Sequence, residues 1–478
     1  MATTTERAGV DPVAAFLQRY PSFGATAALD RLRASEFARL DAQGHVYLDY
    51  TGGGLYADSQ VRRHAEQLLA NVFGNPHSSN PTSMKAAELV EECRRHILSY
   101  FNASPDDYVL VFTANASKAL KLVGESYPFA AGSTFLLTFD NHNSVNGIRE
   151  FARSRGARTV YVPVLPPDMR ADDHAVAASL SAIQLGKPSL FAYPAQSNFS
   201  GVQHPLAWIE QAQRRGWDVL LDAAAFVPTN RLDLGAVKPD YVVLSFYKMF
   251  GYPTGVGALL ARRPALEKLR RPWFAGGTIT VASVQADRHY LAPGFAAFEE
   301  GTQTYLTIPA VDIGLQMLES IGIEAIHTRV SCLTGWLIDA LTSLQHDNGE
   351  PLIQLYGPPT TDRRGATLAL NFFDRVGRPI DHRLIELQAN RERISLRTGC
   401  FCNPGAGETA LGLSKGELDS CFMRSTRRMT FDDFRRCIDG KSTGAVRVSL
   451  GLASNFEDVQ AMARFAAQFL DWSEDAED

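Results

Sequence analysis

One lysine in this chain stands where its amine could do covalent chemistry. The apolar, β-branched segment 241–246 leads directly to Lys248, and the next apolar segment begins at Val256 after a glycine-rich turn. A lysine at the tip of a buried strand is partly desolvated, which favours the neutral amine that forms a Schiff base with an aldehyde. Most lysines are solvated surface charges, so the interpretation depends on this setting.

A carboxylate closes another apolar segment. Asp222 ends the segment 218–222, where burial of its charge is costly without a cationic partner. A protonated pyridine nitrogen would be such a partner, and the pairing would keep the ring an electron sink. Asp222 could equally cap the helix that follows.

Three further segment ends carry polar groups. Residues 113–117 (TANAS) would expose backbone N–H groups and a hydroxyl at the start of a helix, which suits a phosphate, although an ordinary helix cap has the same composition. His142 could stack on an aromatic ring or be an ordinary loop histidine. Asn198 could donate to a ring oxygen or make a turn.

The cysteines offer a second kind of chemistry. The chain has six, which is few for 478 residues, so we expect buried fillers or reactive thiols rather than disulfides. Cys400 and Cys402 lie close together, but their spacing and the absence of a second pair argue against a metal site. The turn formers around Cys402 predict an exposed, flexible loop.

The elements that must position these residues form a repeating pattern. Apolar strands alternate with helical stretches, which predicts an α/β domain with a doubly wound, mostly parallel sheet. The strands are expected at 108–112, 134–139, 159–164, 189–194, 218–222, 241–246 and 256–261. Ligands bind at the carboxyl ends of such strands, so the polar residues above are expected to converge.

The rest of the chain predicts a smaller α+β domain. Two helical patterns fill 306–345, and strands at 352–356, 366–372 and 445–450 alternate with helices near 380–389 and 455–470. We expect a large domain over 46–310 and a small domain over 311–478 that also includes a helical segment at 1–45.

Composition and charge narrow the class of partner. The chain has 47 basic and 52 acidic residues and a formal net charge of -5, so no basic field is available for nucleic acid or an anionic membrane. The N-terminus lacks the pattern of a secretory signal, and no apolar run is long enough to span a bilayer. We expect a cytoplasmic protein with a small-molecule substrate.

Taken in order, these segments resemble the aminotransferase class V family of enzymes dependent on pyridoxal 5'-phosphate (PLP), and within it the cysteine desulfurases. The likeness is greatest to the PLP domain of molybdenum cofactor sulfurases. The motifs that carry it are YLDYTGGGLY (47–56), FTANASKAL (112–120), DNHNSV (140–145), SNFSG (197–201), LDAAAFVPT (221–229), SFYKMFGYPTGVGALL (245–260), FAGGT (274–278), FEEGT (298–302), RTGCFCNPGA (397–406) and GAVRVSLG (444–451).

The resemblance implies a PLP-dependent transferase of fold type I and gives each residue a role. Lys248 resembles the Schiff-base lysine, and Asp222 the partner of the pyridine nitrogen. His142 resembles the ring-stacking histidine that also shuttles protons. The implied phosphate contacts are Ala116, Ser117 and Ser245, with Thr278 or Thr302 reaching the phosphate of a neighbouring subunit in a homodimer.

The remaining roles concern the substrate. Arg447 resembles the arginine that binds the substrate carboxylate, and Arg397 is expected to assist the cysteine loop. Cys402 aligns with the cysteine that accepts sulfur from L-cysteine as a persulfide while alanine leaves. Cys400 would relay the persulfide or be a bystander.

The chain departs from the pattern of desulfurases in two places. Ala225 stands where they usually have Gln, which leaves Asn198 to contact the ring's phenolic oxygen, and Tyr247 stands where they have His. The sulfurases also continue into a second domain, which we expect to be absent beyond Asp478, so the sulfur acceptor is open. A carbon-sulfur lyase acting on a cysteine conjugate and a non-catalytic PLP-fold scaffold are the alternative functions.

Overall fold

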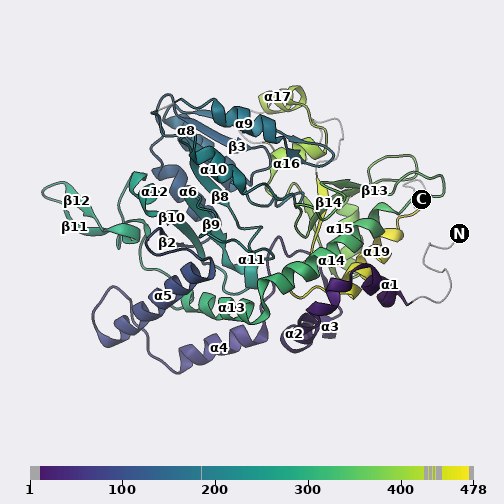
Figure 1. Ribbon diagram of the computed structural model, residues 1–478, viewed down its shortest axis with the longest axis horizontal. Coiled ribbons are helices and arrows are strands. Elements are labelled where there is room, and N and C mark those ends of the chain that lie inside the picture. The colour runs from purple at the N-terminus through teal and green to yellow at the C-terminus, as the bar shows by residue number, and fades with distance from the viewer. Residues whose placement is uncertain are drawn as a thin grey trace.

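A seven-stranded sheet forms the centre of the computed structural model, which describes residues 11–184, 186–424, 429, 433, 437 and 444–472 (Figure 1). The order is β2-β10-β9-β8-β7-β3-β4, with β10 antiparallel to both neighbours and parallel pairing from β9 to β4. The strands are β2 (Tyr108–Thr113), β3 (Thr134–Thr138), β4 (Arg158–Val162), β7 (Leu190–Pro194), β8 (Asp218–Asp222), β9 (Tyr241–Ser245) and β10 (Gly257–Arg262). All seven predicted strands are confirmed, with ends that differ by a residue or two.

Both faces of the sheet are buried, as in a doubly wound domain. Along β2, Val109 and Val111 enter one apolar cluster while Leu110 and Phe112 enter another, because successive side chains point to opposite faces. The first face is covered by α6 (Ala116–Ser126), α7 (Asn143–Asn146), α8 (Ile148–Ser154) and α12 (Arg263–Lys268). The second is covered by α5 (Pro81–Tyr100), α9 (Asp173–Ser181), α10 (Ala207–Gln213) and α13 (Ile308–Ile321), with α4 (Asp58–Leu69) outside α13.

The shared direction of β2, β3, β7, β8 and β9 brings their carboxyl ends to one edge of the sheet. The short helix α11 (Phe246–Phe250) begins there, directly after β9, and carries Lys248. It ends at Gly251, whose φ of +76° and close approach to the backbone of Leu55 both require glycine. The segment around Leu55 therefore packs directly on the end of α11.

The smaller sheet is antiparallel, in the order β13 (Ile353–Tyr356), β14 (Thr367–Phe372), β17 (Ala445–Ser449) and β16 (Arg397–Gly399). Its helices are α14 (Ile323–Thr342), α15 (His382–Arg391) and α19 (Phe456–Ala467), with α16 (Pro404–Ala410) and α17 (Lys415–Arg424) after the cysteine loop. Three of these strands and the helices α13, α14, α15 and α19 match the prediction. The sequence did not reveal β16, because three residues reading Arg-Thr-Gly carry no apolar alternation.

Several short elements lie outside the two main sheets. They are β1 (Val46–Tyr47) paired with β15 (Ile394–Ser395), β5 (Val164–Leu165) with β6 (Arg170–Ala171), the hairpin β11 (Ile279–Ser283) and β12 (Arg288–Leu291), and η2 (Gly294–Phe298). In Figure 1 this hairpin extends away from the body, opposite the smaller sheet. None of the helices in the described ranges is both long and apolar enough to cross a membrane.

The N-terminal segment packs with the smaller sheet's helices. It comprises α1 (Pro12–Arg19), η1 (Pro21–Thr26), α2 (Ala28–Glu36) and α3 (Ala38–Ala42), with η1 against α14 (Figure 1). The buried Arg33 joins α2 to α19 through Asp458 at 2.5 Å, and it also donates to the Ala453 carbonyl at 2.7 Å. The domain boundaries at 45 and 310 stay predictions.

The expectation that the cysteines remain thiols is wrong for one pair. Cys421, on α17, and Cys437 form a disulfide, with Cα atoms 5.6 Å apart. Cysteine spacing alone cannot reveal such a pair, because the chain path that brings the two Cα atoms within bonding range is set by tertiary structure. Cys93, Cys332, Cys400 and Cys402 are free thiols.

Replacing Arg33 by Ala tests how the N-terminal segment is held. The substitution leaves the carboxylate of Asp458 buried without its cation, so we expect a loss of about 3–5 kcal/mol in the free energy of unfolding. Denaturant titration measures it. The matched control is Arg31→Ala on the exposed side of the same helix, expected within about 0.5 kcal/mol of wild type. Equal effects of the two substitutions would contradict the account.

Candidate active site

A cavity of about 450 Å³ lies at the carboxyl edge of the large sheet. Its lining includes seven of the residues singled out in the sequence: Ala116, Ser117, His142, Asn198, Asp222, Ser245 and Lys248. Each lies at the end of a parallel strand or within four residues after it, so the parallel topology is what brings them together.

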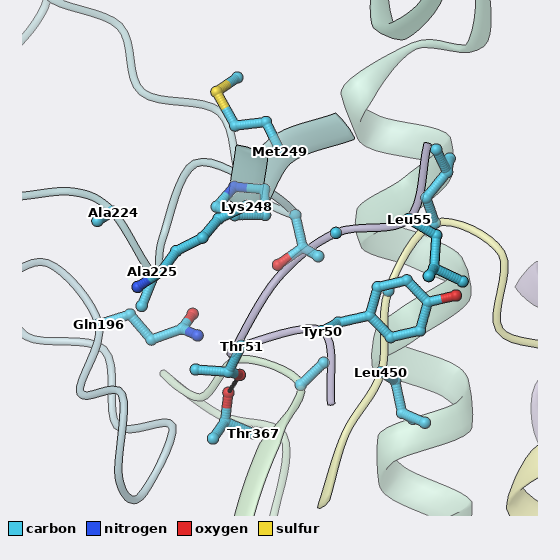
Figure 2. A pocket seen from close by; sticks show the side chains of 16 residues that line it. Tyr50, Thr51, Leu55, Gln196, Ala224, Ala225, Lys248, Met249, Thr367 and Leu450 are labelled. Carbon is cyan, nitrogen blue, oxygen red and sulfur yellow. Dashed lines mark hydrogen bonds between the residues drawn. The ribbon is translucent and has the colours of Figure 1, made fainter. Parts of the chain in front are cut away.

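Lys248 extends from α11 into this cavity. Figure 2 shows its side chain running toward Ala225, with Gln196 beside it. Burial is the main cause that lowers the pKa of Lys248 below its ordinary value of 10.5, and the positive charge of Arg447 lowers it further. Asp222 acts in the opposite direction. The net lowering means that the amine becomes neutral at a lower pH than the amine of a solvated lysine.

The contacts of Asp222 are compatible with both roles that its position allows. Its Oδ1 accepts a hydrogen bond from the backbone N–H of Ala224 at 3.0 Å, which is the capping contact. Its Oδ2 has no donor among the residues that the structure describes, although the carboxylate lines the cavity. One oxygen therefore fixes the orientation while the other is available to a cationic ring nitrogen.

An anion-binding corner lies at the start of α6. The cap Asn115 accepts from Lys118 N at 2.9 Å, which leaves the N–H groups of Ala116 and Ser117 at the positive end of the helix. The hydroxyl of Ser245 is buried and has no hydrogen-bond partner in the described parts of the chain. A Cβ on Gly257 would come within 2.6 Å of Asn115, so glycine permits this close approach.

These donors fit the phosphate of PLP. A buried, orphaned hydroxyl is costly unless a ligand satisfies it, and a helix N-terminus favours negative charge. The Ser117 hydroxyl is paired with that of Ser144 at 2.6 Å, so Ser117 offers its backbone N–H more directly than its side chain.

His142 is the N-terminal cap of α7 and lines the same cavity. Its Nδ1 accepts from Ser144 N at 3.1 Å, which places the proton of the neutral ring on Nε2. Burial is the largest cause that lowers the pKa of His142 below its ordinary value of 6.5. A neutral imidazole is thus held in a fixed orientation.

Asn198, expected to donate to a ring oxygen or to make a turn, bonds to the cysteine loop. Its Nδ2 donates to the Phe401 carbonyl at 2.8 Å, and its Oδ1 accepts from Asn403 at 2.9 Å. Most of its hydrogen-bonding capacity therefore serves the cysteine loop, although the side chain also lines the cavity.

Sequence reasoning missed Gln196, a second amide in the cavity. Its Oε1 accepts from Gln203 Nε2 at 3.1 Å, whereas its Nε2 has no acceptor within the described ranges. Gln196 and Lys248 also line a smaller chamber of about 30 Å³, shown in Figure 2, whose far wall includes the hydrogen-bonded hydroxyls of Thr51 and Thr367, 2.6 Å apart. The position of Gln196 just after the strand 189–194 was the signal available in the sequence.

Arg447 and Arg397 lie beside the cavity and share a carboxylate. Arg447 is 2% exposed, and it donates to the Asn198 carbonyl at 3.1 Å and to Asp49 Oδ1 at 2.9 Å. Arg397 donates to Asp49 Oδ2 from Nε at 3.0 Å and Nη2 at 2.7 Å. Gly52 makes room, because a Cβ there would collide with both Arg397 and Asp49. Asp49, inside YLDYTGGGLY, was the second residue missed.

The cysteine loop covers Arg447. The ring of Phe401 packs on the Arg447 guanidinium at 4.8 Å, and the Cys402 side chain next to it is exposed. Cys400 is half-buried against Gly407 of α16. Within the part of the chain that the structure describes, no group of three or more His, Cys, Asp or Glu side chains could hold a metal ion.

Thr278 and Thr302 lie outside the main cavity. The Thr278 hydroxyl is buried and donates to the Ala275 carbonyl in its own turn at 2.9 Å. Thr302 is exposed, accepts from Asn75 at 3.2 Å and lines an adjoining cavity that shares Ala114 and Gly255 with the main one.

Comparison with known proteins gives a family match and curated relatives. The family model "Aminotransferase class-V" matches residues 46–462. The chain is 39% identical over 459 residues to the molybdenum cofactor sulfurases of Bos taurus and Homo sapiens, covering 91% of this chain and 51% of each relative. It thus spans about half the length of these curated relatives.

Solved structures share the fold. The apo cysteine desulfurase of Thermococcus onnurineus superposes with a TM-score of 0.74 at 20% identity, covering 92% of this chain and 97% of that one. The cysteine desulfurase CsdA of Escherichia coli gives a TM-score of 0.71 at 20% identity, with 92% and 99% coverage.

Replacing Ser245 by Ala tests the anion-binding corner. We expect affinity for PLP, followed by absorbance titration of the apo protein, to fall about tenfold, because a hydrogen bond to a charged group is lost. Thermal stability should be unchanged, since this hydroxyl has no partner within the described structure. Ser126→Ala is the matched control, because that hydroxyl is also buried and unpaired but lies at the other end of α6. Unaltered affinity in Ser245→Ala would remove the hydroxyl from the site.

Proposed function

The chain belongs to the aminotransferase class-V family, and from this premise we propose that it is a PLP-dependent cysteine desulfurase. It takes sulfur from L-cysteine as a persulfide on Cys402, releases alanine and passes the sulfur to an acceptor. The observation that carries the proposal is the half-buried Lys248, with its lowered pKa, in a cavity with Asp222 and an anion-binding corner.

The residues that would hold PLP are those described above. Lys248 would bond to its aldehyde carbon, Asp222 would pair with its ring nitrogen, and the ring of His142 would stack on it. Ala116, Ser117 and Ser245 would hold the phosphate. When bound, this group supplies a ring that takes up the negative charge released as a bond to the substrate Cα breaks.

The chain's own groups supply binding and proton transfer. Arg447, held by the Asn198 carbonyl and Asp49, binds the substrate carboxylate. The Lys248 amine, whose charged form is disfavoured by burial, accepts the proton from the substrate Cα. The neutral His142 carries its proton on Nε2, since Nδ1 is occupied.

Cys402 performs the sulfur transfer. Its deprotonated thiol attacks the substrate sulfur, forming a sulfur–sulfur bond while the bond from that sulfur to the substrate Cβ breaks. The electron pair released on the substrate side takes up a proton as alanine forms. Cys402 must be a free thiol, so a reducing, cytoplasmic location is part of the proposal.

Two further partners belong to the proposal. The acceptor is a molecule that takes a persulfide sulfur, such as a molybdenum cofactor-like or biosynthetic compound. A homodimer would bring a second copy to the phosphate corner, and Thr302 is better placed than Thr278 to contribute, because it is exposed and Thr278 is tied within its own turn.

Cys402→Ala tests the assignment of the sulfur-accepting thiol. We expect PLP absorbance to stay, alanine formation from L-cysteine to fall about a hundredfold or more, and the mass gain of one sulfur on the loop peptide to disappear. Cys400→Ala is the control and should keep all three, because Cys400 faces α16. If the wild type consumes cysteine while Cys402 stays unmodified, the enzyme is a carbon-sulfur lyase instead.

A further inference from the structure

The cysteine loop is short, and both of its flanks are fixed. Before it, β16 ends at Gly399, which pairs with Ala445 of β17. After it, α16 begins at Pro404. Only residues 400–403 separate these elements, so the main chain that carries Cys402 has little length in which to move.

Asn403 is fully buried at the end of this loop and bonds to three different segments. Its Nδ2 donates to the Asp140 carbonyl at 2.7 Å and to Asn198 Oδ1 at 2.9 Å. Its Oδ1 accepts from Ala406 N at 3.2 Å. One side chain thus joins the loop to the segment that precedes His142 and to the segment that follows β7.

Two carbonyl groups of the loop accept hydrogen bonds from the same two segments. The Phe401 carbonyl accepts from Asn198 Nδ2 at 2.8 Å, and the Cys402 carbonyl accepts from Asn143 N at 2.7 Å. Phe401 and Cys402 have φ values of +54° and +56°, a conformation that non-glycine residues keep only when their surroundings impose it. The hydrogen bonds from Asn198 and Asn143 hold the two residues in this conformation.

The surface to which the loop docks is itself held firmly. A Cβ on Gly405 would collide with the Phe139 carbonyl, so α16 approaches β3 as closely as glycine allows. Behind this contact, the buried Asp140 pairs with His204 Nε2 at 2.9 Å. The segment to which the loop docks is therefore also held by a contact outside the loop.

We propose that Asn403 is a positioning residue that holds Cys402 in a docked state beside Arg447, and that sulfur leaves because the acceptor comes to the exposed thiol. This inference rests on the proposed function of Cys402. It replaces the expectation of a flexible loop: the thiol is exposed as predicted, but its backbone is tied to the segments carrying His142 and Asn198. A sulfur acceptor must then place its reacting atom at the protein surface next to Phe401.

The competing explanation is that Asn403 only caps α16. Asparagine and aspartate are equally good caps, so Asn403→Asp separates the two roles. Aspartate keeps the oxygen that accepts from Ala406 N, but it loses both donations from Nδ2 and places a carboxylate against the oxygens of Asp140 and Asn198.

The experiment uses the PLP-loaded protein and compares wild type with Asn403→Asp. We expect unchanged PLP absorbance and an unchanged KM for L-cysteine. The single-turnover rate of persulfide formation on Cys402 should fall at least about tenfold, because docked geometry is lost. Hydrogen exchange of the amides over 398–406 should accelerate. A variant with wild-type rate and wild-type protection would overturn the proposal in favour of capping.

A second pair of variants tests the same docking without touching Asn403. Asn143→Pro removes the N–H that donates to the Cys402 carbonyl, and proline is tolerated here because Asn143 is the first residue of α7. Asn143→Ala keeps that N–H and is the matched control. We expect faster exchange and slower persulfide formation in the proline variant alone, and equal behaviour of the pair would contradict the proposal.

Failure of the proposed function can be distinguished from failure of the docking proposal. A wild type that forms no persulfide would reject that function, whereas the exchange rates of the loop amides in wild type, Asn403→Asp and Asn143→Pro would still decide whether the loop is held docked.

Discussion

The desolvation of one amine is the constraint around which this site is organised. Lys248 lies at the carboxyl edge of a parallel sheet, where desolvation disfavours a charged ammonium. Asp222 opposes this effect, so the lysine is kept close to a carboxylate without being locked into an ion pair with it. The neighbouring strand ends then supply an anion-binding corner and a neutral histidine, because the topology brings every parallel strand to the same edge.

A second group of charges, two arginines that share one carboxylate, lies beside the cavity. Arg447 and Arg397 would repel each other and lower the pKa of Lys248, and the carboxylate of Asp49 lies between the two guanidinium groups. The ring of Phe401 covers Arg447, so the group expected to bind the substrate carboxylate and the loop expected to take the sulfur are in direct contact. Binding of substrate and positioning of Cys402 are therefore parts of one packed unit.

Much of the fold and the cavity followed from the sequence, because both depend on local pattern. Apolar runs predicted all seven strands of the large sheet, and the residues directly after them predicted Lys248, Asp222, Ser245 and His142 as neighbours. The contributions of Asp49, Gln196 and Asn403 were not predictable in the same way. Asp49 and Asn403 act through partners distant in sequence, as Asp49 does with Arg447, and such pairings are visible only when the chain is folded. For Gln196 the only signal was its position just after the strand 189–194. The disulfide between Cys421 and Cys437 was missed because tertiary structure brings the two residues together, and the short strand β16 was missed because its three residues carry no apolar alternation.

The central claim is that the amine of Lys248 is the group that bonds to PLP. Its most direct test is to load the apo protein with PLP, reduce the adduct with borohydride and locate the label by peptide mass spectrometry. The account predicts one stoichiometric label, on Lys248, formed with a half-maximal pH below 10.5, because burial lowers the pKa of this amine. A label spread over surface lysines, or none at all, would contradict it.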